Sequence, residues 1–361
     1  MSNIIEYEDI TAFHPGCYVA DIIEDMGITQ AEFAIRMGTT PKTISKLVNG
    51  QCNLSNDLAQ KLSTMLGTSV DVWLNLQKTY NEKLIEIEKQ KAFNEQSDIA
   101  SVIDYSYFIK YASLFPHRKM TDKIQALCSY LKIADLRILT QPDFLVNFRS
   151  SGKKNEEKNL INARAWLQTA INVSQRIQTE KFNAERLIQH IPEIRQMTLK
   201  GPDEFLPRLR QIFSECGVVF VLLPHLKNSG INGAVKWLNS DRVILAMNDR
   251  RNYADTFWFS LFHEIKHVLQ QKNKIVFVST TVNDLDDELE AEADQFARDT
   301  LIPPDQYATF APSPYTSDAE IIRFAKNIQI HPGIVAGRLQ HDGIIPQNRC
   351  THLKEKYSII A

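Results

Sequence analysis

The chain has 361 residues, with 41 Lys and Arg against 43 Asp and Glu, so its formal net charge is −2. Hydrophobic residues make up 43% of it, which is ordinary for a soluble globular protein with room for two or three domains. The near balance of charge excludes a general affinity for polyanions, so any contact with DNA must come from a local surface.

The chain shows no targeting or membrane signal. It has no run of about eighteen apolar residues, and the acidic segment 1–10 lacks the basic and apolar regions of a secretory signal. The five cysteines are scattered and form no CxxC pair: Cys17, Cys52, Cys128, Cys216 and Cys350. We therefore expect a cytoplasmic protein with reduced thiols, no membrane partner and no cysteine zinc site.

A pair of short helices is the first clear local signal. Thr29 and Glu32 have the spacing of a capping box, which predicts the start of a helix. Gly38 ends this helix, and Pro41 occupies the favoured first position of the next one. Two short helices joined by a glycine turn follow the helix-turn-helix plan. Two further helices are predicted after them, capped by Ser55 and Ser69.

From His14-Pro15-Gly16 to Trp73-Leu74-Asn75-Leu76-Gln77, the sequence resembles the HigA-type antitoxins, a branch of the lambda-repressor-like (XRE) regulators. The resemblance covers about residues 12–80 and implies a five-helix domain that binds operator DNA. Gln30 and Lys42 are predicted to contact phosphate, and base contacts are predicted from the exposed face of the second helix. On that face, Thr43, Lys46 and Asn49 are predicted to reach base edges, and Ser45 is a further DNA-binding candidate that faces out beside them.

The charge of this domain leaves an alternative open. Up to Gln77 it holds nine acids, against five Lys and Arg if Lys78 is counted. Because phosphate contacts supply much of the affinity for DNA, a helical domain of this fold that contacts proteins instead is the competing interpretation.

The middle of the chain, residues 86–200, is predicted to be a helical connector. Its apolar residues have helical spacing, and the polar run 150–158 is predicted to be a loop. It contains no motif that indicates chemistry.

After Gly201 the pattern changes to short β-branched runs. Strands are predicted at 218–223, 234–238 and 243–247, followed by helices at 253–271 and 286–301. The predicted fold class is therefore mainly α with a small β-sheet (α+β).

The first of these two helices carries a metal-binding pattern. His263, Glu264 and His267 have the HExxH spacing, which puts both imidazoles on one face of a helix and the carboxylate beside them. A tetrahedral zinc ion needs a third protein ligand. In the second helix, Glu290 and Glu292 flank the apolar face on opposite sides, so periodicity alone does not choose between them.

His263 to His267, together with the segment from Glu290 to Ala297, resembles the ImmA/IrrE family of zinc peptidases over about residues 217–343. The resemblance implies a zincin-like domain that binds Zn²⁺ through His263, His267 and Glu292, with Glu264 as the general base. Lys266 departs from the glycine that is common in relatives. The sequence does not choose an oxyanion-stabilising residue among Tyr253, His225, His331 and Arg338.

A second helix, turn and helix is predicted near the C-terminus, at 320–328 and 332–340. Few basic residues are exposed in this segment, so we interpret it as a packing module of the peptidase domain.

Together these patterns predict three regions: a DNA-binding domain (1–85), a connector (86–200) and a metallopeptidase domain (201–361). The predicted protein is a HigA-like antitoxin and transcriptional regulator, which carries a zinc-dependent endopeptidase acting on a protein substrate. Its expected partners are operator DNA, a toxin protein and a second copy of the chain. Two alternatives remain: a non-catalytic antitoxin with a degenerate peptidase scaffold, and a stress-response protease that cleaves a separate repressor.

Overall fold

The computed structural model describes residues 3–141, 156–250, 253–270 and 284–358, and only the backbone of 156–157 and 284–287. The chain divides into two compact units, residues 1–97 and 98–361. The prediction of a mainly α chain with small sheets is confirmed. Most of the predicted loop at 150–158 lies outside the described residues, and its last three residues already belong to a helix.

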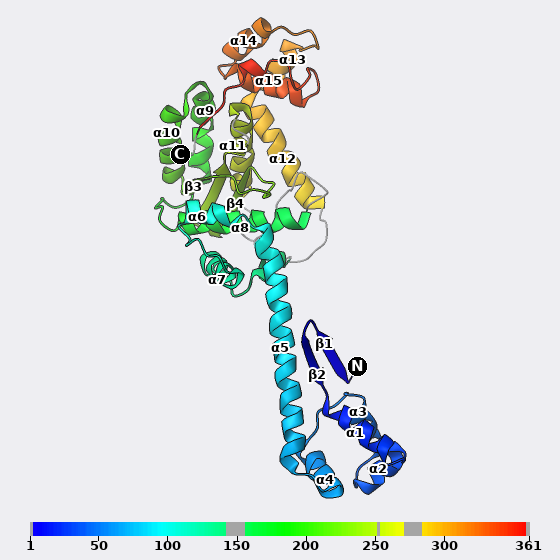
Figure 1. The fold of residues 1–361 in the computed structure, drawn as a ribbon. Coiled ribbons are helices and arrows are strands. Elements are labelled where there is room, and N and C mark those ends of the chain that lie inside the picture. The colour runs from blue at the N-terminus through cyan, green and yellow to red at the C-terminus, as the bar shows by residue number, and fades with distance from the viewer. Residues whose placement is uncertain (1–2, 142–155, 251–252, 271–283, 359–361) are drawn as a thin grey trace. The chain divides into compact units, whose positions relative to one another are not determined.

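Unit 1 contains a hairpin, four whole helices and most of a fifth (Figure 1): β1 (Ile4–Tyr7), β2 (Ile10–Phe13), α1 (Pro15–Asp25), α2 (Gln30–Arg36), α3 (Pro41–Val48), α4 (Asn56–Leu66) and α5 (Val70–Val102). The helices agree with the predicted five-helix domain, whereas the antiparallel hairpin was not predicted. Ala12 of the hairpin packs with Tyr80 and Ile87 of α5. This contact with a distant helix makes the short strands stable, and local sequence does not reveal it.

Helix α5 is continuous through residue 85, where the predicted DNA-binding domain ends. No glycine or proline occurs between Val70 and Val102, so nothing in the local sequence interrupts it. The division between the two units also falls within this helix.

The start of α1 fixes its place against α3 and α5. The His14 ring accepts a hydrogen bond from the backbone N–H of Gly16 (2.9 Å) and meets the Tyr80 ring edge-on, with centroids 4.9 Å apart. A Cβ on Gly16 would lie 1.9 Å from the carbonyl oxygen of Leu47. The backbones of α1 and α3 can therefore approach this closely only with glycine at position 16.

Unit 2 contains the second sheet and the remaining helices. Its strands are β3 (Val218–Leu223), β4 (Gly233–Asn239) and β5 (Arg242–Asn248), in the order β3-β5-β4. Strand β3 is parallel to β5, and β4 is antiparallel to it. The helices are α6 (Tyr105–Ala112), α7 (Met120–Leu131), η1 (Leu136–Thr140), α8 (Glu156–Ser174), α9 (Ala184–Gln196), η2 (Met197–Leu199), α10 (Pro202–Glu215), α11 (Ala254–Leu269), α12 (Asp284–Leu301), α13 (Pro304–Phe310), α14 (Asp318–Asn327), α15 (Pro332–His341) and η4 (Thr351–Leu353).

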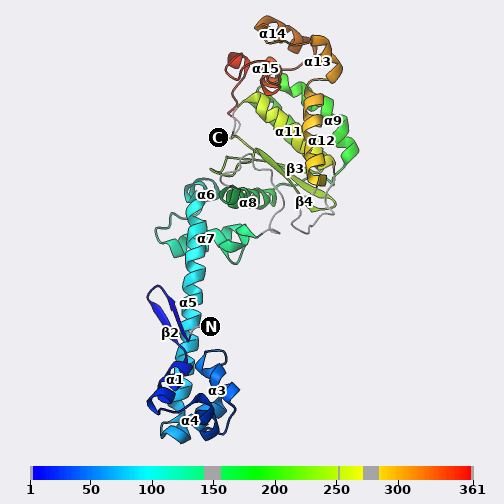
Figure 2. The ribbon, with the colours of Figure 1, turned by 90° about the vertical axis from the view of Figure 1, so that its right-hand side faces the viewer.

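The sheet of unit 2 lies between helices (Figures 1 and 2). Helix α8 packs against β3 and β5, whereas α11 packs against β4 and β5. Residues 161–170 of α8 are all buried, and the indole N–H of Trp166 donates to the carbonyl of Pro224 (3.0 Å). Part of the predicted connector is thus packed onto the sheet, since a helix buried on all sides needs partners around it.

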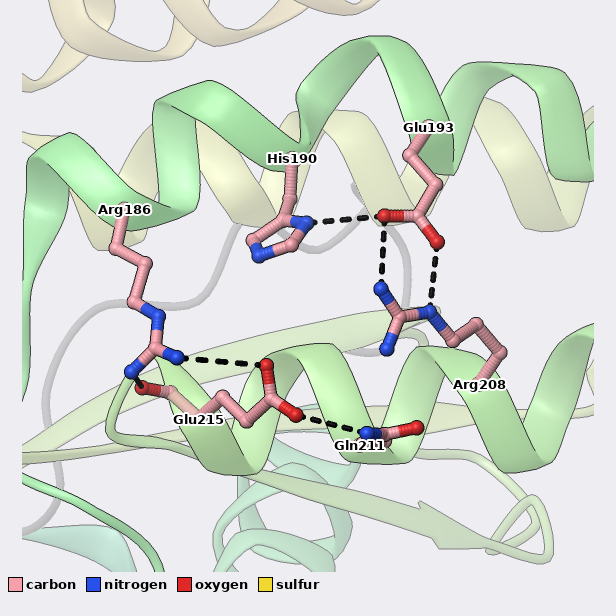
Figure 3. Close-up of polar contacts among 6 residues, drawn as sticks. All are labelled: Arg186, His190, Glu193, Arg208, Gln211 and Glu215. Carbon is pink, nitrogen blue, oxygen red and sulfur yellow. Dashed lines mark hydrogen bonds and ion pairs between the residues drawn. The ribbon is translucent and has the colours of Figure 1, made fainter.

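Polar side chains join α9 to α10 along an outer face (Figure 3). Glu193 accepts from Arg208 (2.6 Å) and contacts His190 (3.0 Å), while Arg186 pairs with Glu215. Arg208 first, and His190 to a lesser extent, hold the pKa of Glu193 below its usual value. These exposed ion pairs add little stability, so the buried faces of α9 and α10 are the main source of their packing.

Helices α14 and α15 repeat the turn geometry of α2 and α3. Gln329 (φ +56°) stands where Gly38 (φ +58°) stands, and in both cases a proline begins the second helix three residues later. Helix α15, however, packs against α11 and η4. A Cβ on Gly333 would lie 2.7 Å from the carbonyl oxygen of Leu353. Because α15 is covered in this way, its surface is not free to enter a DNA groove, which agrees with a packing module.

Candidate metal centre and helix-turn-helix surface

The metal-binding pattern lies on a well-anchored helix. No glycine or proline interrupts α11, and its buried residues join the main core of unit 2 through Phe257, Leu261 and Ile265. His263, Glu264 and His267 lie in its last two turns, where α12 packs beside it (Figure 2). The predicted HExxH helix is therefore present in the structure.

Three side chains converge between α11 and α12. The Nε2 atoms of His263 and His267 are 2.9 Å apart. The Glu290 carboxylate lies 3.4 Å from the first and 3.3 Å from the second. One ligand atom from each residue falls within 4.8 Å of the others, which is the arrangement that a single metal ion requires.

The other ring nitrogen of each histidine is held by a second residue. Asp294 lies 2.8 Å from Nδ1 of His263, and the Gln270 side-chain oxygen lies 2.9 Å from Nδ1 of His267. An acceptor at Nδ1 keeps the proton there and leaves the Nε2 lone pair for a metal. Neither Asp294 nor Gln270 is predicted from the sequence to support the site, although Asp294 follows Glu290 by one helical turn and Gln270 follows His267 by three residues.

The donor set is rich in negative charge. Burial lowers the pKa of His263, but hydrogen bonds to Asp294 and Glu290 raise it to about 10. Burial raises the pKa of Glu290, and its bonds to His263 and His267 more than reverse this, so the net shift is downward. The cluster thus attracts a cation, which is a proton in the metal-free protein and can be a divalent metal ion instead.

Glu264 is buried beside this cluster, with 8% of its surface exposed. Its Cγ and Oε1 lie against the backbone of Gly233 on β4. Burial raises its pKa, with the two histidines opposing the shift. A carboxylate with a raised pKa is suited to accept a proton near neutral pH.

The structure does not bring Glu292 to the two histidines. Its carboxylate lies 3.3 Å from Nζ of Lys266 and 3.3 Å from the amide nitrogen of Gln270. The side chain of Glu292 is 56% exposed, against 28% for Glu290. The reason is the packing of α12, which buries Ala293 and Ala297; Glu290 shares their face, and Glu292 lies about 200° around the helix from it.

The four candidates for oxyanion stabilisation make other contacts. Tyr253 pairs with Lys356 ahead of α11, His331 caps α15, and Arg338 pairs with Asp342. The backbone N–H of His225 donates to Asp249 (2.8 Å). These contacts give no reason to prefer any of the four.

On unit 1, helix α3 presents the predicted DNA contacts. Lys42 and Lys46 are exposed one turn apart, and Gln30 is exposed at the start of α2. Thr43 and Ser45 are partly exposed between them. Asn49 is exposed, but its side-chain amide donates to the carbonyl of Ser45 (2.7 Å) and so caps the end of α3.

The capping box expected at the start of α2 is only half formed. Thr29 accepts from the backbone N–H of Glu32 (3.2 Å), whereas the Glu32 carboxylate bonds to Arg36. Glu32 thus offsets the charge of the exposed Arg36 on α2, and Lys42 and Lys46 supply the positive charge of α3.

Comparison with known proteins agrees with this division of the chain. Residues 19–73 match the family described as Helix-turn-helix. The HTH-type transcriptional regulator YddM of Escherichia coli is 36% identical over 75 residues, which are 21% of this chain and 78% of that protein. The chain belongs to the helix-turn-helix transcriptional regulators.

Other relatives of this regulator match the same region. Antitoxin HigA-1 of Vibrio cholerae is 40% identical over 57 residues, which are 16% of this chain and 53% of that protein. Among solved structures, an antidote protein of a plasmid maintenance system from Nostoc punctiforme is 32% identical, with a TM-score of 0.23, over 23% of this chain and 92% of that one.

The regulator has a second family match in unit 2. Residues 226–340 match the IrrE N-terminal-like domain, so both resemblances noted in the sequence are confirmed at the level of family. This match includes α11, α12 and the metal-binding cluster. In the described part of the chain, no helix is long and apolar enough to cross a membrane.

Proposed function

We propose that unit 1 binds operator DNA through α3 and that unit 2 is a zinc-dependent endopeptidase acting on a protein substrate. The first part is supported by the exposed Lys42 and Lys46 on α3 and by the match to transcriptional regulators. Lys42 and Gln30 contact phosphate, while Thr43 and Lys46 reach base edges. Two copies of the chain bind paired half-sites, which doubles the positive charge presented by α3.

The DNA-binding proposal is tested by exchanging Thr43 and Lys46 for alanine together. We expect the specific shift of operator DNA to disappear while circular dichroism remains unchanged, because both side chains lie outside the core of unit 1. The matched control is Lys78→Ala, which removes a positive charge far along the chain from α3. An unchanged shift in the double variant would refute the assignment of α3 and favour a role in protein contacts.

The peptidase proposal depends chiefly on one observation: His263, His267 and Glu290 bring three ligand atoms within 4.8 Å of one another. The Nδ1 atoms of the two histidines are hydrogen-bonded to Asp294 and Gln270, which leaves both Nε2 atoms for the metal. We assign Glu290 as the third ligand in place of Glu292. Two imidazoles and a carboxylate are a donor set suited to Zn²⁺. A zinc ion bound there would lower the pKa of a bound water to about 7 and polarise the scissile carbonyl.

The protein's own residues would transfer the proton, orient the imidazoles and bind the substrate. Glu264 accepts a proton from the attacking water on its carboxylate and returns it to the leaving amine. Asp294 and Gln270 keep the imidazoles of His263 and His267 oriented. Strand β4 is an edge of the described sheet and passes beside Glu264, so its free side can pair with an extended substrate.

Metal content of the purified protein tests the site. We expect about one zinc ion per chain in the wild type by mass spectrometry, and its loss in His263→Ala. Hydrolysis of labelled casein should accompany the metal and stop in Glu264→Gln, which keeps the ligands. A wild type that binds no zinc even after reconstitution would demote unit 2 to a degenerate scaffold and leave DNA and toxin binding as the function.

The toxin partner is proposed from the name of one relative, antitoxin HigA-1. Co-purification with the product of a neighbouring gene tests it, since an antitoxin holds its toxin in a stable complex. A neighbouring repressor that the protein cleaves would favour the stress-response protease instead.

A further inference from the structure

Gly233 occupies an unusual position beside the metal-binding cluster. It begins β4, pairs with Met247 of β5 and lies under the side chain of Glu264. A Cβ built on Gly233 would lie 2.9 Å from Cγ and 2.9 Å from Oε1 of Glu264, and 2.9 Å from the sulfur of Met247. Backbone conformation does not explain the glycine, because its φ is outside the left-handed region.

The two residues that a side chain at position 233 would meet differ in how easily they can move away. The Met247 sulfur is at the flexible end of its side chain and can move aside. Glu264 cannot move as freely, because it is buried and its neighbours on α11, Phe262 and Ile265, are packed into the core. An added methyl group would therefore displace the carboxylate of Glu264.

We propose that Gly233 is a positioning residue for Glu264. The missing side chain on β4 leaves room for the carboxylate against the edge strand, beside His263 and His267. Among the atoms nearest to a Cβ at position 233, none belongs to the three proposed ligands. The role of Gly233 in catalysis rests on the proposed peptidase function, whereas the contact with Glu264 does not.

A thermal-stability cycle on the metal-free protein tests the contact. Gly233→Ala should lower the melting temperature of the wild type, and this loss should shrink by at least half in a Glu264→Ala background, where Cγ and Oε1 are absent. The control is Gly201→Ala, at a helix start where nothing lies within 4 Å of the added methyl. If Gly233→Ala alone fails to fold, recovery of folding in the double variant is the expected result. Equal losses in both backgrounds would overturn the proposal.

The visible spectrum of bound Co²⁺ tests the positioning role, which a merely structural glycine would not affect. Gly233→Ala should bind one Co²⁺ with wild-type affinity, and its absorption bands should move toward those of Glu264→Gln. A wild-type spectrum in Gly233→Ala would refute positioning of Glu264. A wild type that takes up no Co²⁺ would count against the proposed peptidase, and the stability cycle would then decide the contact alone.

Discussion

The choice between Glu290 and Glu292 can be decided by two matched substitutions to glutamine. Glu290→Gln removes a carboxylate that lies 3.4 Å and 3.3 Å from the two Nε2 atoms. Glu292→Gln removes a carboxylate that is paired with Lys266 and Gln270 instead of meeting the two Nε2 atoms. Each change keeps the size of the side chain and removes one negative charge, so only the position of the charge differs.

The expected magnitudes are well separated. Loss of a residue that merely orients a ligand costs about 10–100-fold in metal affinity, so loss of a ligand should cost more than about 100-fold, or about 2.7 kcal/mol. A unit charge roughly 10 Å from a divalent ion changes its binding free energy by about 0.8 kcal/mol in water. Because the Glu292 side chain is 56% exposed and paired with Lys266, water-like screening applies, and Glu292→Gln should weaken binding by about fourfold.

Zinc affinity is measured by competition with a chromophoric chelator at one pH and salt concentration. Glu288→Gln, another exposed site on α12, controls for the general loss of negative charge. Glu290 is not the third ligand if Glu292→Gln loses zinc as completely as Glu290→Gln, or if Glu290→Gln keeps wild-type affinity. The first of these results would restore the ligand implied by family resemblance.

Three further predictions follow from the same contacts. Asp294→Asn should weaken zinc binding by about 10–100-fold by releasing Nδ1 of His263; an unchanged dissociation constant would exclude this role. In the metal-free protein, burial lowers the pKa of His263 but Asp294 and Glu290 raise it to about 10. The stability it contributes is thus complete below its unfolded pKa of about 6.5 and is lost as pH rises toward about 10. Thermal melting of the metal-free protein should fall over this range, while the zinc-loaded protein, whose metal replaces the proton, should show a smaller fall; parallel curves would contradict the assignment. Gly16→Ala should destabilise unit 1 by at least about 1–3 kcal/mol in urea unfolding, because its methyl meets the backbone of Leu47. Gly201→Ala, in unit 2, should leave the unfolding of unit 1 unchanged, and wild-type stability of unit 1 in Gly16→Ala would refute the close contact.

Much of the candidate site could be predicted because it depends on local spacing. Residues four apart share a helix face wherever the helix lies, so His263 and His267 are placed together by the sequence of α11 alone. The helix-turn-helix is local in the same sense, since Gly38 and Pro41 define its turn without help from distant residues.

Contacts between elements required the tertiary structure. Glu290 and Glu292 are equally compatible with the spacing along α12, and the burial of Ala293 and Ala297 against α11 decides which one faces the histidines. The same holds for position 233, where a glycine is needed because the side chain of Glu264, 31 positions later in the sequence, packs against it. It holds also for α15, which has the turn of a DNA-reading helix and is covered by the C-terminal segment. Spacing within a helix determines which side chains share a face, and only packing between elements determines what that face meets.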